Sequence, residues 1–230
     1  SGDARRAVNL LEIFCHRLQD SDEELTTDMT EEILGEGVLR FDRNQDYRYG
    51  LVSALIKSMR ASHPDASLYY LARLLECGED PVYIARRLII FASEDVGNAN
   101  PHALGFATSA LQAVHAIGMP EARIILAQIV TFLSGSPKSK ESYYALGRAR
   151  DDVMKEQDLE IPKHILNAPT KFMKNLGYGK DYKNPYREQA EARKQEYLPE
   201  KLKGKRYYHP SNNGFELKIK EYLEKNRPFN

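Results

Sequence analysis

The sequence has no apolar run near the ~18 residues that a membrane span requires, and no secretory leader. It has only two cysteines, Cys15 and Cys77, and both lie in apolar helical patterns without the spacing of metal ligands. These absences argue against a disulfide and predict two reduced core thiols in a cytoplasmic protein.

Catalytic signatures are missing as well. No phosphate-binding loop of the pattern G-x-x-x-x-G-K-[ST] is present, and residues 177–180 lack both its spacing and its hydroxyl group. No apolar run ends in two acids on a predicted strand, as a Walker B segment would, and the six histidines form no i, i+4 pair. Residues 134–136 lack the leading glycine and the strand of a nucleophile elbow. We therefore expect neither a catalytic centre nor a metal site in this chain.

Glu94 and Asp95 are adjacent carboxylates that follow an apolar helical run. Such a pair can perform acid–base chemistry, which is one hypothesis for it. The alternative is a solvated or ion-paired helix end, for which Arg86 and Arg87 on the same helix are candidate partners.

Helical periodicity is what the sequence does contain. Of 230 residues, 42% are hydrophobic and 29% are charged, which suits a soluble globular protein with one good-sized core. Apolar residues recur at three- and four-residue spacing from the first helix, which begins at Asp3, through most of the first 157 residues. No alternating strand pattern of useful length appears. The predicted fold class is all-α.

Three prolines mark successive helix starts. Pro81, Pro101 and Pro120 are separated by 20 and 19 residues, and Asp80 provides an N-cap before the first of them. Because the helices after these prolines are very apolar, at least one is expected to bury both sides, either inside a monomeric bundle or between copies of the chain. The three expected helices cover 82–97, 102–118 and 120–133.

The zero net charge conceals an asymmetry. From Lys171 to the end, the chain has 15 Lys and Arg residues against 8 Asp and Glu, a net charge of +7, and the remainder carries −7. Residues from about 177 to 214 are rich in Tyr and Lys and poor in aliphatic side chains. Since disordered segments carry few aromatics, we expect this stretch to lie over the helical body as an extended arm.

The arm has two interpretations. Its lysines can neutralise phosphates and its tyrosines can stack on bases, as in proteins that bind single-stranded nucleic acid. Alternatively, the tyrosines pack on the acidic helical body and the lysines stay solvated. The second interpretation is favoured, because the prolines at 199 and 210 would fold the arm back. The candidate nucleic-acid contacts are Lys201, Lys203, Lys205, Arg206, Tyr207 and Tyr208.

The first residues, SGDARRAVNLLE, place Arg5 and Arg6 at the start of a helix. A guanidinium held rigidly on a helix can bind phosphate bidentately, although an exposed basic pair is the commoner explanation on physical grounds. The stretch resembles the sensor-2 segment of AAA+ ATPases of the clamp-loader group, whose pattern is roughly Gly-Asp-x-Arg-Arg-Ala-Leu-Asn. By this resemblance Arg5 is the sensor-2 arginine, which reaches the γ-phosphate of the nucleotide, and Arg6 belongs to the same nucleotide-binding motif.

Five further stretches match a known family in its own order and together cover nearly the whole chain: YGLVSALIKSMRASHPDASLYYLARLLECGEDPVYIARRLIIFASEDVG, GMPEARIILAQ, SPKS, NAPTKFMKNLGYGKDYK and YLPEKLKGKRYYHPSNNGFE. They resemble one branch of the clamp-loader group, the replication-associated recombination protein A family, whose eukaryotic relative is the Werner-helicase-interacting protein. The family pattern has Asp at the positions of Gly50 and His63 and Trp at that of Tyr70, and it differs over 187–194.

The resemblance implies a domain organisation and a setting. Residues 1–39 would be the C-terminal part of a AAA+ lid, and 40–230 a helical, collar-like domain that assembles into a homotetramer. The longer parent would be a cytoplasmic, nucleoid-associated, DNA-dependent ATPase that acts at stalled replication forks with single-stranded-DNA-binding protein. Its ATP and Mg²⁺ would be held by an upstream part, so no cofactor is expected in this chain itself.

Three functions compete at this point. The first is an assembly and regulatory region of a AAA+ ATPase, without catalytic power of its own. The second is a stand-alone nucleic-acid-binding helical module that uses the arm, which salt-dependent DNA binding would favour. The third is a small helical enzyme that uses Glu94, Asp95 or a histidine, which nucleotide turnover or metal uptake would favour.

Overall fold

The computed structural model describes residues 48–226 of the chain. The expected helix from Asp3, the arginines Arg5 and Arg6, and Cys15 lie outside the described residues. Within residues 48–226 every regular element is a helix and no strand occurs. The predicted all-α class is confirmed.

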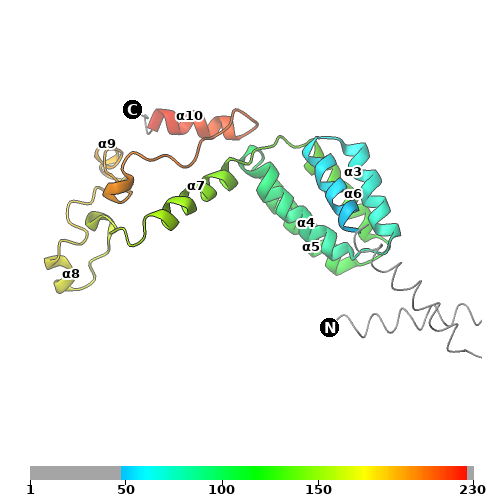
Figure 1. Cartoon of the computed structure of the whole chain (residues 1–230), viewed down its shortest axis with the longest axis horizontal. Coiled ribbons are helices and arrows are strands. Elements are labelled where there is room, and N and C mark those ends of the chain that lie inside the picture. Colours follow the sequence, from blue (N-terminus) through cyan, green and yellow to red (C-terminus); the bar gives the residue numbers. More distant parts are fainter. Residues whose placement is uncertain (1–47, 227–230) are drawn as a thin grey trace, which may run out of the picture.

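A helical bundle occupies the first half of the described chain (Figure 1). Helix α6 packs against α3, α4 and α5, and α4 packs against α5 as well. The helices of the bundle are 48–60, α3 Pro64–Glu76, α4 Pro81–Phe91, α5 Ala103–Ile117 and α6 Ala122–Gly135.

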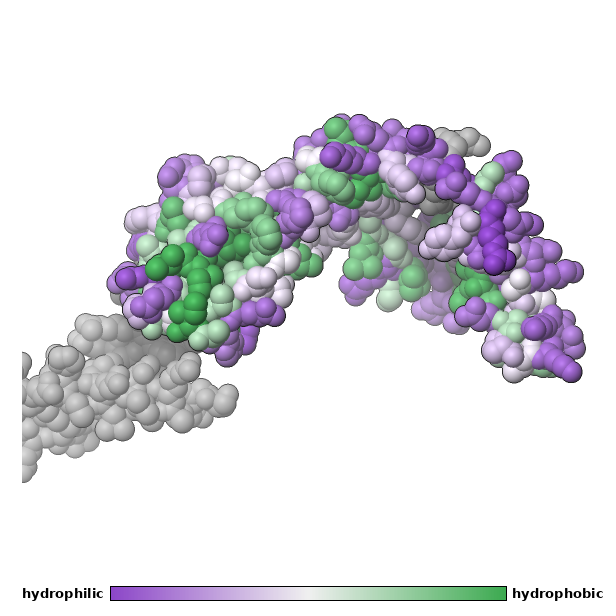
Figure 2. Space-filling view, turned by 180° about the vertical axis from the view of Figure 1, so that it is seen from behind, coloured by the Kyte–Doolittle hydropathy of each residue, from purple (hydrophilic) through white to green (hydrophobic). Residues whose placement is uncertain are grey.

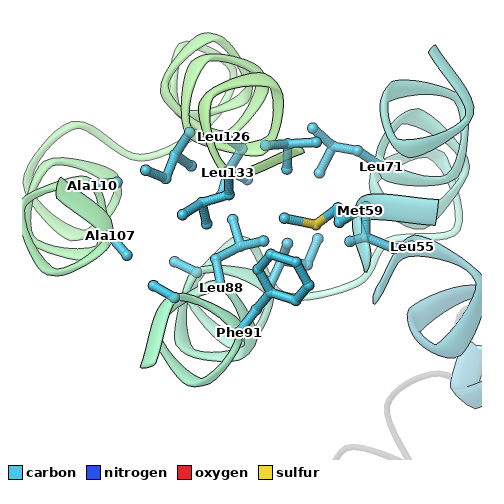
Figure 3. Close-up of a cluster of buried hydrophobic side chains, with 14 of the residues drawn as sticks. Leu55, Met59, Leu71, Leu88, Phe91, Ala107, Ala110, Leu126 and Leu133 are labelled. Carbon is cyan, nitrogen blue, oxygen red and sulfur yellow. The ribbon is translucent and has the colours of Figure 1, made fainter. Parts of the chain in front are cut away.

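All five of these helices contribute side chains to one core (Figure 3). Met59, Leu88 and Leu133 come from three of them and are at most 1% exposed. Phe91 fills the space below Met59, while α5 contributes small residues such as Ala107, which let its backbone approach α4 closely. Burying side chains of this size stabilises the fold by about 1.5–3 kcal/mol each.

The turns between these helices follow capping rules. Asp80 Oδ1 accepts a hydrogen bond of 2.9 Å from Val82 N, and Pro81 occupies the first turn of α4, as predicted. The helices expected to begin at residues 102 and 120 begin at Ala103 and Ala122, one and two residues later than predicted. At the first of these, the side chain of Asn100 accepts from His102 N at 3.1 Å, so a side-chain turn precedes the helix.

Helix α4 does not end at Phe91 but widens into a π-helical turn, Ala92–Val96, followed by a 3₁₀ turn, Gly97–Ala99. A π-helical turn accommodates more residues per turn, and it shifts the side chains that follow to a new direction. Here it directs Asp95 inward, where this carboxylate is only 2% exposed.

Helix α7, Glu141–Lys155, leads away from the bundle to a distal region of short elements (Figure 1). The arm was expected to lie over the helical body; its last residues, 207–214, do contact the bundle, but α9, Gln189–Ala192, lies at the far end of α7 from the bundle. The reason is that the 15 residues of α7 carry the chain about 22 Å along its axis. The later elements are the 3₁₀ turn Lys163–Ile165, α8 Lys171–Asn175, α9 Gln189–Ala192, the 3₁₀ turn Glu200–Leu202 and α10 Glu216–Asn226.

Candidate functional site

After α7 and the distal region, the chain returns to the end of the bundle through residues 207–216, here called the return segment. Phe215, which directly follows Gly214, donates from its backbone N to Ala99 O at 2.8 Å, and Asn213 Nδ2 donates to Lys138 O at 3.0 Å. Gly214 has a φ of 53°, and a Cβ there would lie 2.2 Å from Ala99 O. Only glycine allows the two backbones to approach this closely.

A buried carboxylate holds the return segment in place. Glu216 is 0% exposed, and its Oε1 accepts a 2.6 Å hydrogen bond from the hydroxyl of Tyr208. Its Oε2 accepts from both Oγ and N of Ser211, at 2.6 and 3.1 Å. The Tyr208 hydroxyl also accepts from Asn98 Nδ2 at 3.0 Å, which links the segment to the bundle. Both carboxylate oxygens of Glu216 are therefore paired, as a buried charge requires.

The fold shifts the pKa values of both Glu216 and Tyr208. Burial by itself raises the pKa of Glu216, but hydrogen bonds from Ser139, Ser211 and Tyr208 outweigh it and leave this pKa below its usual value of 4.5. Burial, together with the hydrogen bond to Glu216, raises the pKa of Tyr208 to about 12. The structure thus stabilises a carboxylate and a neutral phenol side by side.

A second carboxylate, Asp152 on α7, binds residues at the start of the return segment and just before it. Lys205 Nζ lies 2.6 Å from each of its two oxygens, and the Tyr207 hydroxyl donates to Oδ2 at 2.9 Å. Arg148 Nε donates to the carbonyl of Tyr207 at 2.8 Å. The hydrogen bonds from Lys205 and Tyr207 lower the pKa of Asp152.

The other predicted nucleic-acid residues also contact their own chain. Lys201 pairs with Glu156, and Lys203 Nζ lies 3.6 Å from Glu200 Oε1. Arg206 Nε donates to Tyr208 O at 3.2 Å. Of the six predicted residues, Lys201, Lys205 and Tyr207 contact α7 or the residue that follows it, Tyr208 contacts the bundle, and Lys203 and Arg206 contact residues of their own stretch. Their binding to nucleic acid stays a prediction.

The adjacent carboxylates Glu94 and Asp95 take part in ion pairs. Arg60 holds Asp95 bidentately, with Nε 2.7 Å from Oδ1 and Nη2 3.2 Å from Oδ2. Lys140 Nζ lies 2.7 Å from Glu94 Oε1 and 3.8 Å from Asp95 Oδ1. The partners expected on the same helix, at 86 and 87, are wrong, because the π-helical turn directs Asp95 toward helix 48–60. These contacts fit an ion-paired helix end.

Neither a metal site nor a membrane span emerges from the described part of the chain. Across residues 48–226, no three His, Cys, Asp or Glu side chains are grouped so that they could hold a metal ion. The helices of the same stretch are all too short or too polar to cross a bilayer. Cys77 is a free, partly buried thiol.

One face of the bundle is strongly apolar, and here it is called the α5–α6 face. Helix α5 presents Phe106, Ser109, Ala110 and Ala113 at i, i+3, i+4 and i+7, and α6 presents residues 125, 128, 129 and 132 at the same spacing. Between them lies a groove of about 380 Å³. Figure 2 shows apolar side chains gathered on the bundle. The exposed apolar residues of the two helices and their connection are Leu104, Phe106, Ile117, Met119 and Ile124.

Sequence reasoning missed several of these residues. Nothing in the pattern around Glu216 or Asp152 distinguishes them from solvated helix acids, because their partners lie 8 and 53 residues away. The α5–α6 face did have a signal, since the helices after Pro101 and Pro120 are apolar on more than one side.

Comparison with known proteins agrees with this architecture. Residues 61–227 match the family described as MgsA AAA+ ATPase C terminal, and residues 1–60 match the AAA C-terminal domain. The boundary between the two matches falls at the end of helix 48–60, whose side chains share the core of the bundle with α3. The matches therefore meet inside one packed unit.

Curated relatives extend over the whole chain. Replication-associated recombination protein A of Coxiella burnetii is 44% identical over 100% of this chain and 53% of its own length. The protein of that name in Bacillus subtilis is 39% identical over 97% of this chain and 54% of its own length. ATPase WRNIP1 of Dictyostelium discoideum is 35% identical over 90% of this chain and 26% of its own length. The chain thus spans about half the length of its bacterial relatives, and it belongs to the MgsA AAA+ ATPase C-terminal family.

Proposed function

We propose that this chain is the assembly and regulatory region of a AAA+ ATPase of DNA replication and recombination, and that four copies associate through the α5–α6 face. The names of its relatives, replication-associated recombination protein A and ATPase WRNIP1, support the setting. ATP hydrolysis, Mg²⁺ binding, action on DNA and contact with single-stranded-DNA-binding protein are proposed for the whole protein. Arg5 and Arg6 would there act as sensor-2 residues toward the nucleotide.

The observation that carries the assembly proposal is the exposure of large apolar side chains on the α5–α6 face. Ile124 is 67% exposed, Ile117 57% and Phe106 52%. Scattered exposed apolar residues are common on monomers, but a contiguous apolar patch around a groove marks an interaction site. A second copy would bury these side chains, and a stable interface typically covers about 1,600 Å² in total.

The shape of the face suits a helix as the contacting element. Ala110 and Ala113 on α5 leave the groove open between the bulkier side chains of Phe106 and Phe132. An amphipathic helix can place anchors at i, i+3, i+4 and i+7 into such a groove. The same face of a neighbouring copy offers this spacing on both α5 and α6, so a helix of one copy can enter the groove of the next, and this head-to-tail contact can close a ring of four.

The test is the mass of the chain in solution, measured by light scattering over a concentration series. We expect a mass near four times 26.3 kDa for the unmodified chain. Ile124→Glu and Phe106→Glu should each shift the mass toward the monomer, because a charge in a dry interface is costly. Ile161→Glu is the matched control, since Ile161 is 56% exposed on the distal region. If the unmodified chain is a monomer, or if only Ile161→Glu dissociates the assembly, the proposal is overturned.

A further inference from the structure

The distal end of the molecule has a second basic surface, formed by residues 161–183 and here called the basic tip. It contains five lysines and one acidic residue, Asp181. Figure 1 shows α8, which lies within it, at the far end of α7 from the bundle. The surface is therefore separate from both the α5–α6 face and the return segment.

Four lysines of the basic tip differ from those of the stretch 201–205. Lys201, Lys203 and Lys205 each have a carboxylate partner on the chain itself. Within residues 48–226, by contrast, no ion pair or side-chain hydrogen bond engages the ammonium groups at 163, 171, 174 and 180; among the tip lysines only Lys183 pairs, with Glu188. Unpaired cations close together repel one another, and a polyanion relieves this repulsion.

Aromatic rings stand among these cations. Phe172 lies between Lys171 and Lys174 on α8 and is 70% exposed, and Tyr182 is 44% exposed two residues after Lys180. Two successive backbone turns link Lys174 to Lys180, since Gly177 N donates to Lys174 O at 3.0 Å and Lys180 N donates to Gly177 O at 3.3 Å. Exposed rings interleaved with cations are the arrangement by which proteins bind single strands, with bases stacked on the rings.

A hollow of about 390 Å³ opens beside this surface. Lys163 and Lys180 line it, and Gly179 N donates to Lys163 O at 2.9 Å, which joins its two walls. His164 also lines it, and the Nε2 atom of this ring is buried without a hydrogen-bond partner. Asp181 and Glu196 are also among the residues that line it. The volume suits a small ligand group, and the mixed donors and acceptors suit a base edge or sugar hydroxyl better than a bare phosphate.

We propose that the basic tip binds single-stranded nucleic acid, with phosphates on Lys171, Lys174 and Lys180 and a base stacked on Phe172. A duplex is disfavoured because its bases are already stacked and cannot reach an exposed ring. The hollow beside His164 accepts a neighbouring nucleoside. This surface goes beyond the assembly function and does not depend on it.

Binding of a fluorescein-labelled 20-mer of deoxythymidine tests the proposal, followed by fluorescence anisotropy with the 230-residue chain from 0.1 to 1 M salt. Replacing Lys171, Lys174 and Lys180 with Ala should make the slope of the log association constant against log salt concentration less negative by about 2. Binding at 0.1 M salt should then be about 100-fold weaker. Phe172→Ala should weaken binding about 5- to 150-fold without changing the slope.

The matched control replaces the exposed residues Lys57, Lys218 and Lys225 with Ala, which removes the same charge elsewhere on the chain. If this control weakens binding as much as the tip variant, or if the tip variant binds like the unmodified chain, the proposal is overturned. Tighter, tip-dependent binding to anionic lipid vesicles than to the 20-mer would also overturn it in favour of a membrane surface. Light scattering on the same samples separates this result from assembly, since the tip variants should keep the parent mass.

Discussion

The hydroxyl of Tyr208 donates a 2.6 Å hydrogen bond to a carboxylate oxygen of Glu216, eight residues further along the chain. The same hydroxyl accepts from Asn98 of the bundle at 3.0 Å. One phenol oxygen thus joins the end of the bundle to the start of α10. Several consequences of this link can be measured.

Removing the Tyr208 hydroxyl should loosen the return segment. Tyr208→Phe leaves Asn98 and the buried Glu216 each short of a partner, which should destabilise the fold by about 1–3 kcal/mol. Thermal unfolding gives the total loss, and amide exchange at Phe215 N, which bonds Ala99 O, shows where it occurs. Tyr222→Phe, at a side chain 63% exposed, is the control. Equal protection of Phe215 N in both variants would contradict the assigned role.

Alkaline pH should weaken the same link. Because the folded pKa of Tyr208 is raised to about 12 from 10.0, the fold favours the neutral phenol. This contribution to stability is complete below pH 10 and is lost as the pH rises through 12. The thermal unfolding midpoint, measured from pH 9 to 11.5, should fall more steeply with pH for the unmodified chain than for Tyr208→Phe. Parallel curves for the two proteins would show that Tyr208 titrates normally.

Gly214→Ala should be far more damaging than Gly204→Ala. Both glycines have positive φ, 53° and 76°, so each substitution incurs a backbone cost of order 1 kcal/mol. At Gly214 the new Cβ would also lie 2.2 Å from Ala99 O and 2.6 Å from Pro137 Cγ, whereas no atom lies within 4 Å at Gly204. We expect the Gly214 variant to lose protection at Phe215 N. Chemical denaturation of the two variants should differ by at least about 1 kcal/mol beyond the shared cost.

The Arg60–Asp95 pair should show strong coupling. Asp95 is 3% exposed at its side chain while Arg60 is 46% exposed, so losing the arginine leaves a buried carboxylate whose remaining charged neighbours are Lys140 and Lys138. Arg60→Ala should therefore cost more than Arg60→Ala combined with Asp95→Ala, by about 1–3 kcal/mol. Urea unfolding of both single variants and of the double variant gives the free energies for a double-mutant cycle. Additive losses would mean that the pair contributes no coupling.

Much of the bundle could be predicted from local sequence. The proline and cap at Asp80–Pro81 and the apolar spacing after it are signals within a few residues, and the structure confirms both. The starts after Pro101 and Pro120 were misplaced because side-chain and backbone turns precede those helices, a detail that proline position does not indicate.

The candidate sites were harder to predict because their partners are distant in sequence. Tyr207 and Tyr208 were singled out as candidate nucleic-acid contacts, but no local pattern indicates that Tyr207 binds Asp152, which lies 55 residues before it. The basic tip was overlooked because the sequence does not indicate which of its lysines lack a carboxylate partner. Lysines followed by two tyrosines drew attention to the run 201–208, and only the structure shows which lysines have carboxylate partners and which do not.

The bond between Phe215 N and Ala99 O also fixes the mechanics of the chain. Helices α7, α8 and α9 form a loop whose two ends meet at the end of the bundle (Figure 1). Tension applied at α10 would pass directly into the bundle through this junction, and the loop would carry none of it while the junction holds. The basic tip can therefore be displaced, or its backbone cut, without releasing either end of the loop from the bundle.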